Sequence, residues 1–205
     1  MPDCNINLTA QDVINSYSGC SGQRCMAASV LLIVGEQDEL IEKIINISKN
    51  LKPGKNSREI GPVIDRNSLD RITMYIDNSI NFGSKILVDG RTWSKEHSDG
   101  YWIGPTVILH NNLNDPCITD EIFGPVLSTV RVPDYKQALD LVKSNPYGNG
   151  VSIFTRDGDS ARDFASKANI GMVGINIPIP VPVAYHSFGG WKDSLFGSNN
   201  AHGMD

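Results

Sequence analysis

The segment Val30-Leu31-Leu32-Ile33-Val34, followed by the pattern of Gln37–Asn50, decides the fold. The first segment is a short apolar run rich in β-branched residues, which predicts a strand. The second repeats its apolar residues at helical spacing and ends before Leu51-Lys52-Pro53-Gly54, which predicts an amphipathic helix. A strand that is apolar on both faces and leads into such a helix is typical of a parallel sheet covered by helices.

This alternation of strand and helix continues along most of the chain. Helical spacing of apolar residues predicts further helices around Leu69, Ile72, Ile76 and Ile80, and over Tyr135–Lys143 and Asp159–Ala168. Short apolar runs predict further strands at Lys85–Val88, Thr106–Leu109, Leu127–Val132, Val151–Thr155 and Met172–Asn176. We therefore expect an α/β, doubly wound fold with a largely parallel sheet.

The proline repeat Ile177–Val183 interrupts this pattern. Proline removes the backbone donor that a central strand or a helix interior needs. We expect this segment to be an extended connection, held near polyproline geometry at little entropic cost.

The composition of the chain argues against nucleic acids and membranes as partners. The 205 residues carry a formal net charge of −5, with acidic and basic residues interspersed, so no basic stripe is present to bind nucleic acid. No apolar run is long enough to span a membrane, and the first ten residues do not resemble a signal peptide. We expect a soluble protein of the cytoplasm, or of the mitochondrial matrix in a eukaryote.

The four cysteines are expected to be reduced thiols. Cys4, Cys20, Cys25 and Cys117 are too few and too irregular for a secreted disulfide framework. Cys20 and Cys25 are five residues apart without a matching histidine pair downstream, so no metal site is predicted.

Cys25 is the candidate nucleophile. It follows the flexible stretch Gly19–Gly22 and opens the helix-compatible segment Met26–Ser29, which predicts a thiol at a helix amino terminus. The amide groups of such a terminus, with Arg24 adjacent, would favour the thiolate and steady a developing oxyanion. By itself this context is also compatible with a small buried cysteine.

Four motifs in order give this candidate a family context. The segments Gly22–Cys25, Asp120–Val126, Asn145–Asp157 and Phe188–Ser194 resemble, respectively, the nucleophile motif, the cofactor-facing loop, a following motif and the substrate-tunnel loop of aldehyde dehydrogenases. Within that family, Arg24 and the segment Gly174–Pro182 resemble the CoA-acylating methylmalonate-semialdehyde dehydrogenase type.

The resemblance implies roles for five residues. Cys25 would attack the aldehyde, Arg24 would bind the carboxylate of a methylmalonate or malonate semialdehyde, and Phe188 would line the substrate tunnel. Glu121 would hydrogen-bond the ribose hydroxyls of NAD, and Phe123 would pack beside its nicotinamide ring. The implied partners are a small semialdehyde and CoA, which would receive the acyl group as propionyl-CoA or acetyl-CoA.

The resemblance covers practically all of the 205 residues, but these are less than half of the family's typical length. The glycine-rich dinucleotide motif and the family's carboxylate base and oxyanion-hole asparagine are expected upstream, so the major NAD site would lie outside this catalytic domain. The family's oligomerisation strand would follow Asp205, and the full-length enzyme is expected to be a homo-oligomer.

Other functions stay open on the residues alone. A hydrolytic aldehyde dehydrogenase would use the same thiol and release a free acid, a choice that depends on the upstream base. A non-catalytic fragment or interaction module is favoured by the short length. A papain-like hydrolase using Cys25 and His186 is disfavoured, because the order of the surrounding motifs resembles a different family.

Overall fold

The structure is a computed structural model that describes residues 1–56, 59–197 and 200. Its largest sheet has four strands in the order β1-β4-β3-β2. The strands β1, β4 and β3 run parallel, and β2 joins the edge beside β3 in the antiparallel direction. Their bounds are β1 Val30–Val34, β2 Lys85–Val88, β3 Thr106–His110 and β4 Val126–Val132.

Helices cover both faces of this sheet, as a doubly wound fold requires. On β3, Val107 packs in the core under α1 and α2, whereas the next residue, Ile108, packs in the core under α3 and α5. Successive strand residues point to opposite faces, so both faces are buried. These helices are α1 Ile6–Ser18, α2 Asp38–Asn50, α3 Arg66–Asn81 and α5 Pro116–Thr119, and the short α4 covers Thr92–Glu96.

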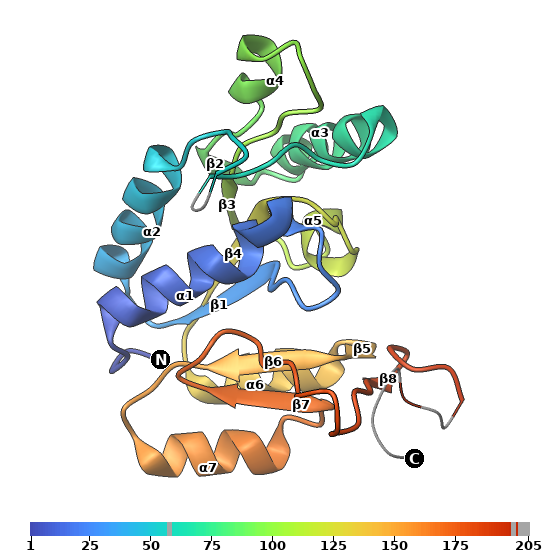
Figure 1. Cartoon of the computed structure of the whole chain (residues 1–205). Coiled ribbons are helices and arrows are strands. Elements are labelled where there is room, and N and C mark those ends of the chain that lie inside the picture. Colours follow the sequence, from blue (N-terminus) through green and yellow to red (C-terminus); the bar gives the residue numbers. More distant parts are fainter. Residues whose placement is uncertain (57–58, 198–199, 201–205) are drawn as a thin grey trace.

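The last third of the chain forms a second, smaller layer, drawn below the large sheet in Figure 1. Its strands pair as β6 with β7, in parallel, and β5 with β8. Helix α6 connects the layers, since Ala138 packs on Val34 while Leu139 packs with Phe164. The bounds are α6 Tyr135–Ser144, β5 Tyr147–Gly148, β6 Gly150–Ile153, α7 Gly158–Lys167, β7 Met172–Ile175 and β8 Trp191–Lys192.

The predicted α/β, doubly wound fold is confirmed, with two differences. The predicted strands fall into separate sheets of four and two strands instead of one sheet, because α6 and the following turn separate them. The proline repeat Ile177–Val183 is an irregular connection, but it bends at Asn176–Ile179 and is not uniformly extended. The carboxyl end of the chain, where the oligomerisation strand was expected to follow, lies outside the described residues.

Helix α1 is the main element that the sequence analysis did not predict. Asn5 caps its amino terminus by accepting a hydrogen bond from Leu8 N. Its buried residues Ala10, Val13, Ile14 and Tyr17 recur at helical spacing and pack against α2 and the large sheet. This helix carries the chain to the loop that holds Cys25.

Asp3 ties the amino terminus to the smaller layer. Its carboxylate accepts hydrogen bonds from Thr155 Oγ1 at 2.8 and 3.0 Å, from Arg156 N at 2.7 Å and from Asp157 N at 2.9 Å. Burial alone would raise the pKa of Asp3, but these hydrogen bonds together lower it below its ordinary value of 3.8. The predicted motif containing Thr155 therefore has a structural role at this position.

We expect Asp3→Asn to destabilise the chain by about 1 kcal/mol at pH 7, a low value because Asp3 is exposed and solvent screens its charge. The folded-state pKa is lowered, so the contribution is present above the unfolded value and is lost as the pH falls through the folded value. Urea unfolding at pH 7 and pH 3 measures this change.

Asp12→Asn is the matched control for that substitution. Burial raises the pKa of Asp12, so removal of its charge should not lower stability at pH 7. Equal losses for both variants would show that the hydrogen bonds of Asp3 contribute nothing specific.

Candidate active site

The loop that holds Cys25 turns sharply between α1 and β1. The 3-10 turn η1 (Gly19–Gly22) contains three successive left-handed residues, Cys20, Ser21 and Gly22, with φ of 52, 58 and 68°. Gln23 N donates to Cys20 O at 3.1 Å and so closes this turn. After this turn the chain reaches the surface, where the Cys25 thiol is free and exposed.

The predicted helix amino terminus at Cys25 is wrong. Cys25 lies in a turn closed by Ala27 N and Arg24 O at 3.0 Å, and no helix begins there in this fully described part of the chain. Ala28 N donates to Ser16 Oγ at 3.3 Å, and Ser29 O accepts from Ser128 N at 2.8 Å. These tertiary hydrogen bonds keep the segment extended before β1 and override its helix propensity.

The Cys25 loop packs directly on the predicted cofactor-facing loop. Gly22 approaches Gly124 so closely that a Cβ at position 22 would collide with the Gly124 carbonyl group, and its φ of +68° also disfavours a side chain. Next to this contact, Glu121 is exposed, and Phe123 is 39% exposed with a φ of 52°. The structure therefore places Glu121 and Phe123 on the loop that touches the Cys25 loop.

Helix α3 and the segment before it fix these two loops. Ser21 Oγ donates to Gly61 O at 2.6 Å, and Gln23 Oε1 accepts from Ile64 N at 2.9 Å. On α3, the Arg71 guanidinium donates to Ile122 O. Both loops are thus held by hydrogen bonds that the sequence analysis did not predict.

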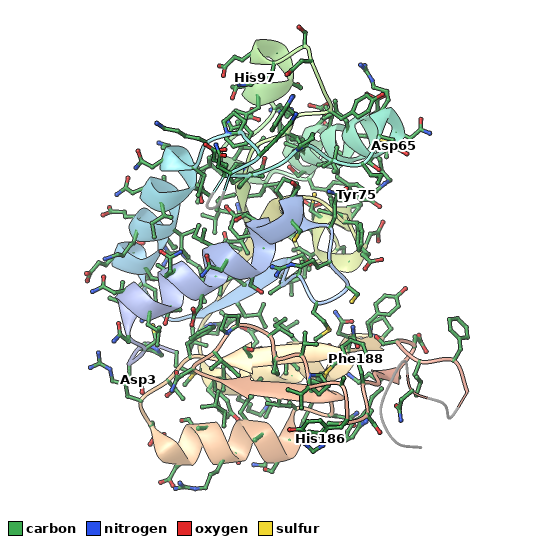
Figure 2. All side chains as sticks on the ribbon, in the orientation of Figure 1. Asp3, Asp65, Tyr75, His97, His186 and Phe188 are labelled. Carbon is green, nitrogen blue, oxygen red and sulfur yellow. The ribbon has the colours of Figure 1, made fainter. Side chains whose placement is uncertain are left out.

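One cavity of about 530 Å³ brings together three of the predicted site residues, Arg24, Cys25 and Phe188. Figure 2 labels Phe188 beside the smaller layer, and Phe188 is the lining residue nearest the carboxyl end of the chain. Glu121 and Phe123 do not line this cavity. Its lining residues are Asn15, Ser16, Gln23, Arg24, Cys25, Met26, Pro178, Ile179, Val181 and Phe188.

Arg24 lies across the carboxyl end of α1. Its Nη2 donates to the carbonyl oxygens of Asn15 at 2.7 Å and Ser16 at 3.1 Å. Asn15 O also accepts from Gly19 N, and the helix dipole favours a cation at this end of α1. Asn15 and Ser16 were missed as site residues because α1 itself was not predicted.

The opposite wall of the cavity is apolar. Pro178, Ile179 and Val181 come from the predicted proline-rich connection, and Met26 lies next to Cys25. Asn149 Nδ2 contacts Met26 Sδ at 3.1 Å and thereby ties the Cys25 loop to the smaller layer. The cavity therefore has a polar side with a cation and a side suited to methylene or methyl groups.

His186 does not line this cavity. It packs against Tyr185 with tilted rings at a centroid distance of 4.8 Å, and it is an exposed residue of the segment that follows the proline repeat (Figure 2). Lys192 instead donates to carbonyl oxygens of Lys143 and Asn145, both at 3.0 Å, at the end of α6. This arrangement gives no support to a dyad of Cys25 and His186.

A serine, a histidine and an aspartate also meet, but inside the core. His110 Nδ1 and Ser84 Oγ each lie 2.9 Å from Asp115 Oδ2, and Cys117 N donates to Asp115 Oδ1 at 2.9 Å. Asp115 is 0% exposed and His110 is 3% exposed. Burial lowers the pKa of His110, although Asp115 opposes this change. A substrate cannot reach this buried network, so its role is structural.

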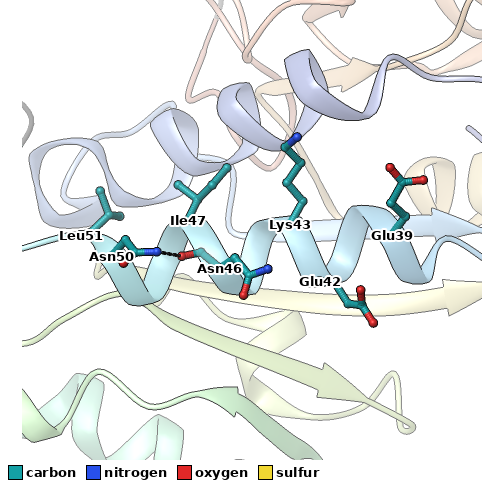
Figure 3. Close-up of a pocket in the computed structure, with 7 residues that line it drawn as sticks. All are labelled: Glu39, Glu42, Lys43, Asn46, Ile47, Asn50 and Leu51. Atoms are coloured by element: carbon teal, nitrogen blue, oxygen red, sulfur yellow. Dashed lines mark hydrogen bonds between the residues drawn. The ribbon is translucent and has the colours of Figure 1, made fainter.

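A second surface hollow of about 560 Å³ runs along α2 (Figure 3). It contains none of the predicted site residues, and Lys43 in its wall contacts Asn7 of α1. Within the described ranges, no group of His, Cys, Asp or Glu side chains is arranged to hold a metal ion. Among those same residues, no helix has both the length and the apolar character needed to cross a membrane.

Comparisons with known proteins cover the whole chain. Residues 1–205 match the model described as "Aldehyde dehydrogenase family". The malonate-semialdehyde dehydrogenase of Pseudomonas aeruginosa is 41% identical over 211 residues, which is 100% of this chain and 42% of that protein.

Solved structures agree with this match. The methylmalonate-semialdehyde dehydrogenase of Oceanimonas doudoroffii has a TM-score of 0.95 and 44% identity, over 99% of this chain and 43% of that one. A Thermus 1-pyrroline-5-carboxylate dehydrogenase with bound NAD has a TM-score of 0.87 and 28% identity, over 94% of this chain and 37% of that one. The chain spans less than half the length of these relatives.

Proposed function

The chain belongs to the aldehyde dehydrogenase family, and we propose that it is the catalytic part of an NAD-dependent semialdehyde dehydrogenase with Cys25 as the nucleophile. One observation carries this proposal: the exposed Cys25 thiol and the Arg24 guanidinium lie at the same cavity, opposite an apolar wall. A thiol nucleophile beside a cation suits a small aldehyde that also carries a carboxylate.

Arg24 is proposed to select the carboxylated substrate. Two hydrogen bonds from Nη2 fix the guanidinium to α1, and no acceptor for its Nε and Nη1 groups is found in the described part of the chain. Either group can donate a charge-assisted hydrogen bond to a carboxylate while the aldehyde carbon lies near Cys25. The apolar wall formed by Pro178, Ile179 and Val181 would contact the methylene or methyl group of malonate or methylmalonate semialdehyde.

The proposed chemistry proceeds through sulfur. The Cys25 thiolate adds to the aldehyde carbon, and the carbonyl π electrons move to oxygen, which gives the oxyanion of a thiohemiacetal. NAD, when bound, accepts the hydride that this carbon loses. The resulting thioester on Cys25 is attacked by the thiol of CoA, which restores the free Cys25. For malonate semialdehyde, the bond between the α carbon and the carboxylate also breaks, CO2 leaves, and the α carbon takes up a proton equivalent to the one that the CoA thiol releases, so the products are acetyl-CoA, CO2 and NADH.

The loop beside Cys25 fits the nicotinamide half of NAD. Glu121 and Phe123 are both exposed on the loop that the Gly22 contact holds against the Cys25 loop. We propose that Glu121 accepts hydrogen bonds from the ribose hydroxyls and that Phe123 packs beside the nicotinamide ring. The 205 residues contain no glycine-rich turn of the G-x-G-x-x-G type that would bind the phosphates of NAD. The 205 residues alone should therefore bind NAD weakly and should not turn over the semialdehyde.

Alkylation of Cys25 by a charged and a neutral reagent tests the proposed role of Arg24 on the chain itself. Iodoacetate carries a carboxylate beside the carbon that sulfur attacks, whereas iodoacetamide is its neutral analogue. We expect Arg24→Gln to lower the ratio of the two alkylation rates at Cys25 about fivefold, the effect of roughly 1 kcal/mol between exposed charges. Mass spectrometry of the Cys25 peptide measures both rates.

Any effect of Arg24 on the reactivity of the Cys25 thiol cancels in the ratio, because both reagents react with the same thiolate. Arg66→Gln on α3 is the control, because Arg66 is exposed and pairs with Asp70 away from the cavity lining. Cys4 and Cys117 should react slowly, since both are buried and burial raises the pKa of Cys117 to about 12. An unchanged ratio in Arg24→Gln would contradict carboxylate binding by Arg24.

A further inference from the structure

Gly19 lies directly under the guanidinium group of Arg24. A Cβ at position 19 would be 2.6 Å from Nη2, 3.0 Å from Cζ and 3.4 Å from Nη1 of Arg24. The first of these distances is too short for a real contact, so a side chain and the present guanidinium position exclude each other.

The backbone of Gly19 does not itself require glycine. Its φ of −57° and ψ of 135° are accessible to any L-residue. Gly19 N donates to Asn15 O at the end of α1, a bond that any residue except proline could make. The reason for a glycine at this position is therefore the space that Arg24 fills.

Arg24 is held on two sides as a result. Along one edge, Nη2 is fixed by the carbonyl groups of Asn15 and Ser16, and one flat face of the guanidinium covers Gly19. A long, exposed arginine side chain without such constraints samples many rotamers. The constraint keeps the cation at the cavity that Cys25 lines.

We propose that Gly19 is a positioning residue for Arg24, and that it thereby determines how strongly the Cys25 site prefers substrates with a carboxylate. The inference rests on the proposed role of Arg24 in carboxylate binding. It goes further in assigning the preference to a residue that is neither charged nor part of the cavity lining. A methyl group at position 19 should displace the guanidinium, because the end of a flexible side chain moves more easily than backbone.

The experiment uses the iodoacetate-to-iodoacetamide rate ratio at Cys25 in the 205-residue chain. Gly19→Ala should lower the ratio at least about threefold, most of the fivefold loss expected for Arg24→Gln. The double variant should show no further loss, because Gly19 acts through the guanidinium that Arg24→Gln has already removed. Thermal unfolding should stay cooperative, with a midpoint within about 4 °C of the original chain.

Gly61→Ala is the matched control. Gly61 lies in the segment that anchors Ser21, and a Cβ there would meet nothing within 4 Å. This variant should leave the ratio unchanged. A second test is the Arg24→Lys background, where the slender ammonium group removes the collision. There, Gly19→Ala should change the ratio much less than it does beside arginine.

Three outcomes would overturn the inference while leaving the proposed function intact. They are a normal ratio in Gly19→Ala when Arg24→Gln lowers it, additive losses in the double variant, and a Gly19→Ala chain that no longer unfolds cooperatively. Loss of cooperative unfolding in Gly19→Ala would count against the inference, because the inference expects the added methyl group to move only the Arg24 guanidinium. If Arg24→Gln itself leaves the ratio unchanged, the proposed function of Arg24 fails first, and the role of Gly19 fails with it.

Discussion

Replacing Cys25 by alanine is expected to lower kcat for NADH formation from malonate semialdehyde by at least about a thousandfold, because no covalent intermediate can form without the thiol. The assay uses the natural polypeptide that carries these residues. The structure supports a selective loss, since Cys25 is exposed in a turn and its side chain makes no hydrogen bond in the described part of the chain. The variant should therefore unfold at the same urea concentration as the parent.

Cys20→Ser provides the control in the same loop. Cys20 is also an exposed free thiol, but it lies in the left-handed turn and does not line the cavity. Its replacement should change kcat less than about threefold, as expected for a surface substitution away from the chemistry. Full activity in Cys25→Ala would reject the proposed mechanism. Equal losses in both variants would point to the loop conformation instead of the Cys25 thiol.

The largest expected effect on stability is that of Asp115→Ala, which should cost about 3–5 kcal/mol because it leaves buried polar partners unpaired. The removed carboxylate accepts from Ser84 Oγ and Cys117 N and lies 2.9 Å from His110 Nδ1. Ser84 Oγ and His110 Nδ1 also lie 2.9 Å apart and can remain paired, but Cys117 N loses its side-chain acceptor, and His110 Nε2 already has no hydrogen-bond partner among the described residues. Urea unfolding at pH 7 measures the loss.

Asp134→Ala separates this network from simple helix capping. Asp115 caps α5 and Asp134 caps α6, but Asp134 is exposed, and among the described residues its carboxylate accepts a hydrogen bond only from Gln137 N, at 2.8 Å. Loss of that cap alone should cost about 1 kcal/mol. If Asp115→Ala costs no more than Asp134→Ala, the buried network adds nothing to the stability of the fold.

Burial of His110 also predicts how stability depends on pH. Burial lowers its folded-state pKa, so His110 takes up a proton less readily in the folded protein than in the unfolded chain. The stability associated with this residue is present above its unfolded pKa of 6.5 and is lost as the pH falls through the lowered folded value.

Elements with a strong periodic pattern were predicted from the sequence with small errors. The strands Val30–Val34 and Lys85–Val88 have the predicted bounds, and α2 starts one residue later than expected, at Asp38. Their residues are apolar at the period of the element they form, so local pattern and tertiary burial favour the same structure. Ile80 is an exception, since it continues the apolar pattern of α3 but is 51% exposed.

Helix α1 shows where the local pattern was too weak. Its buried face includes Thr9, Ala10 and Ser16, whose small or polar side chains do not stand out as an apolar stripe. The Asn5 cap followed by Ile6, Ala10, Val13, Ile14 and Tyr17 is the signal that would have identified it.

The sequence by itself determined the α/β alternation, the family and the chemical type of the site residues. The presence of a thiol, a guanidinium and an apolar connection follows from the residue types alone. Only the tertiary structure decided how they meet. It placed Cys25 in a turn instead of at a helix terminus, because the hydrogen bonds from Ala28 N to Ser16 Oγ and from Ser128 N to Ser29 O keep the following backbone extended. It also fixed Arg24 on α1 over Gly19, a contact between segments whose approach depends on the packing of the whole helix.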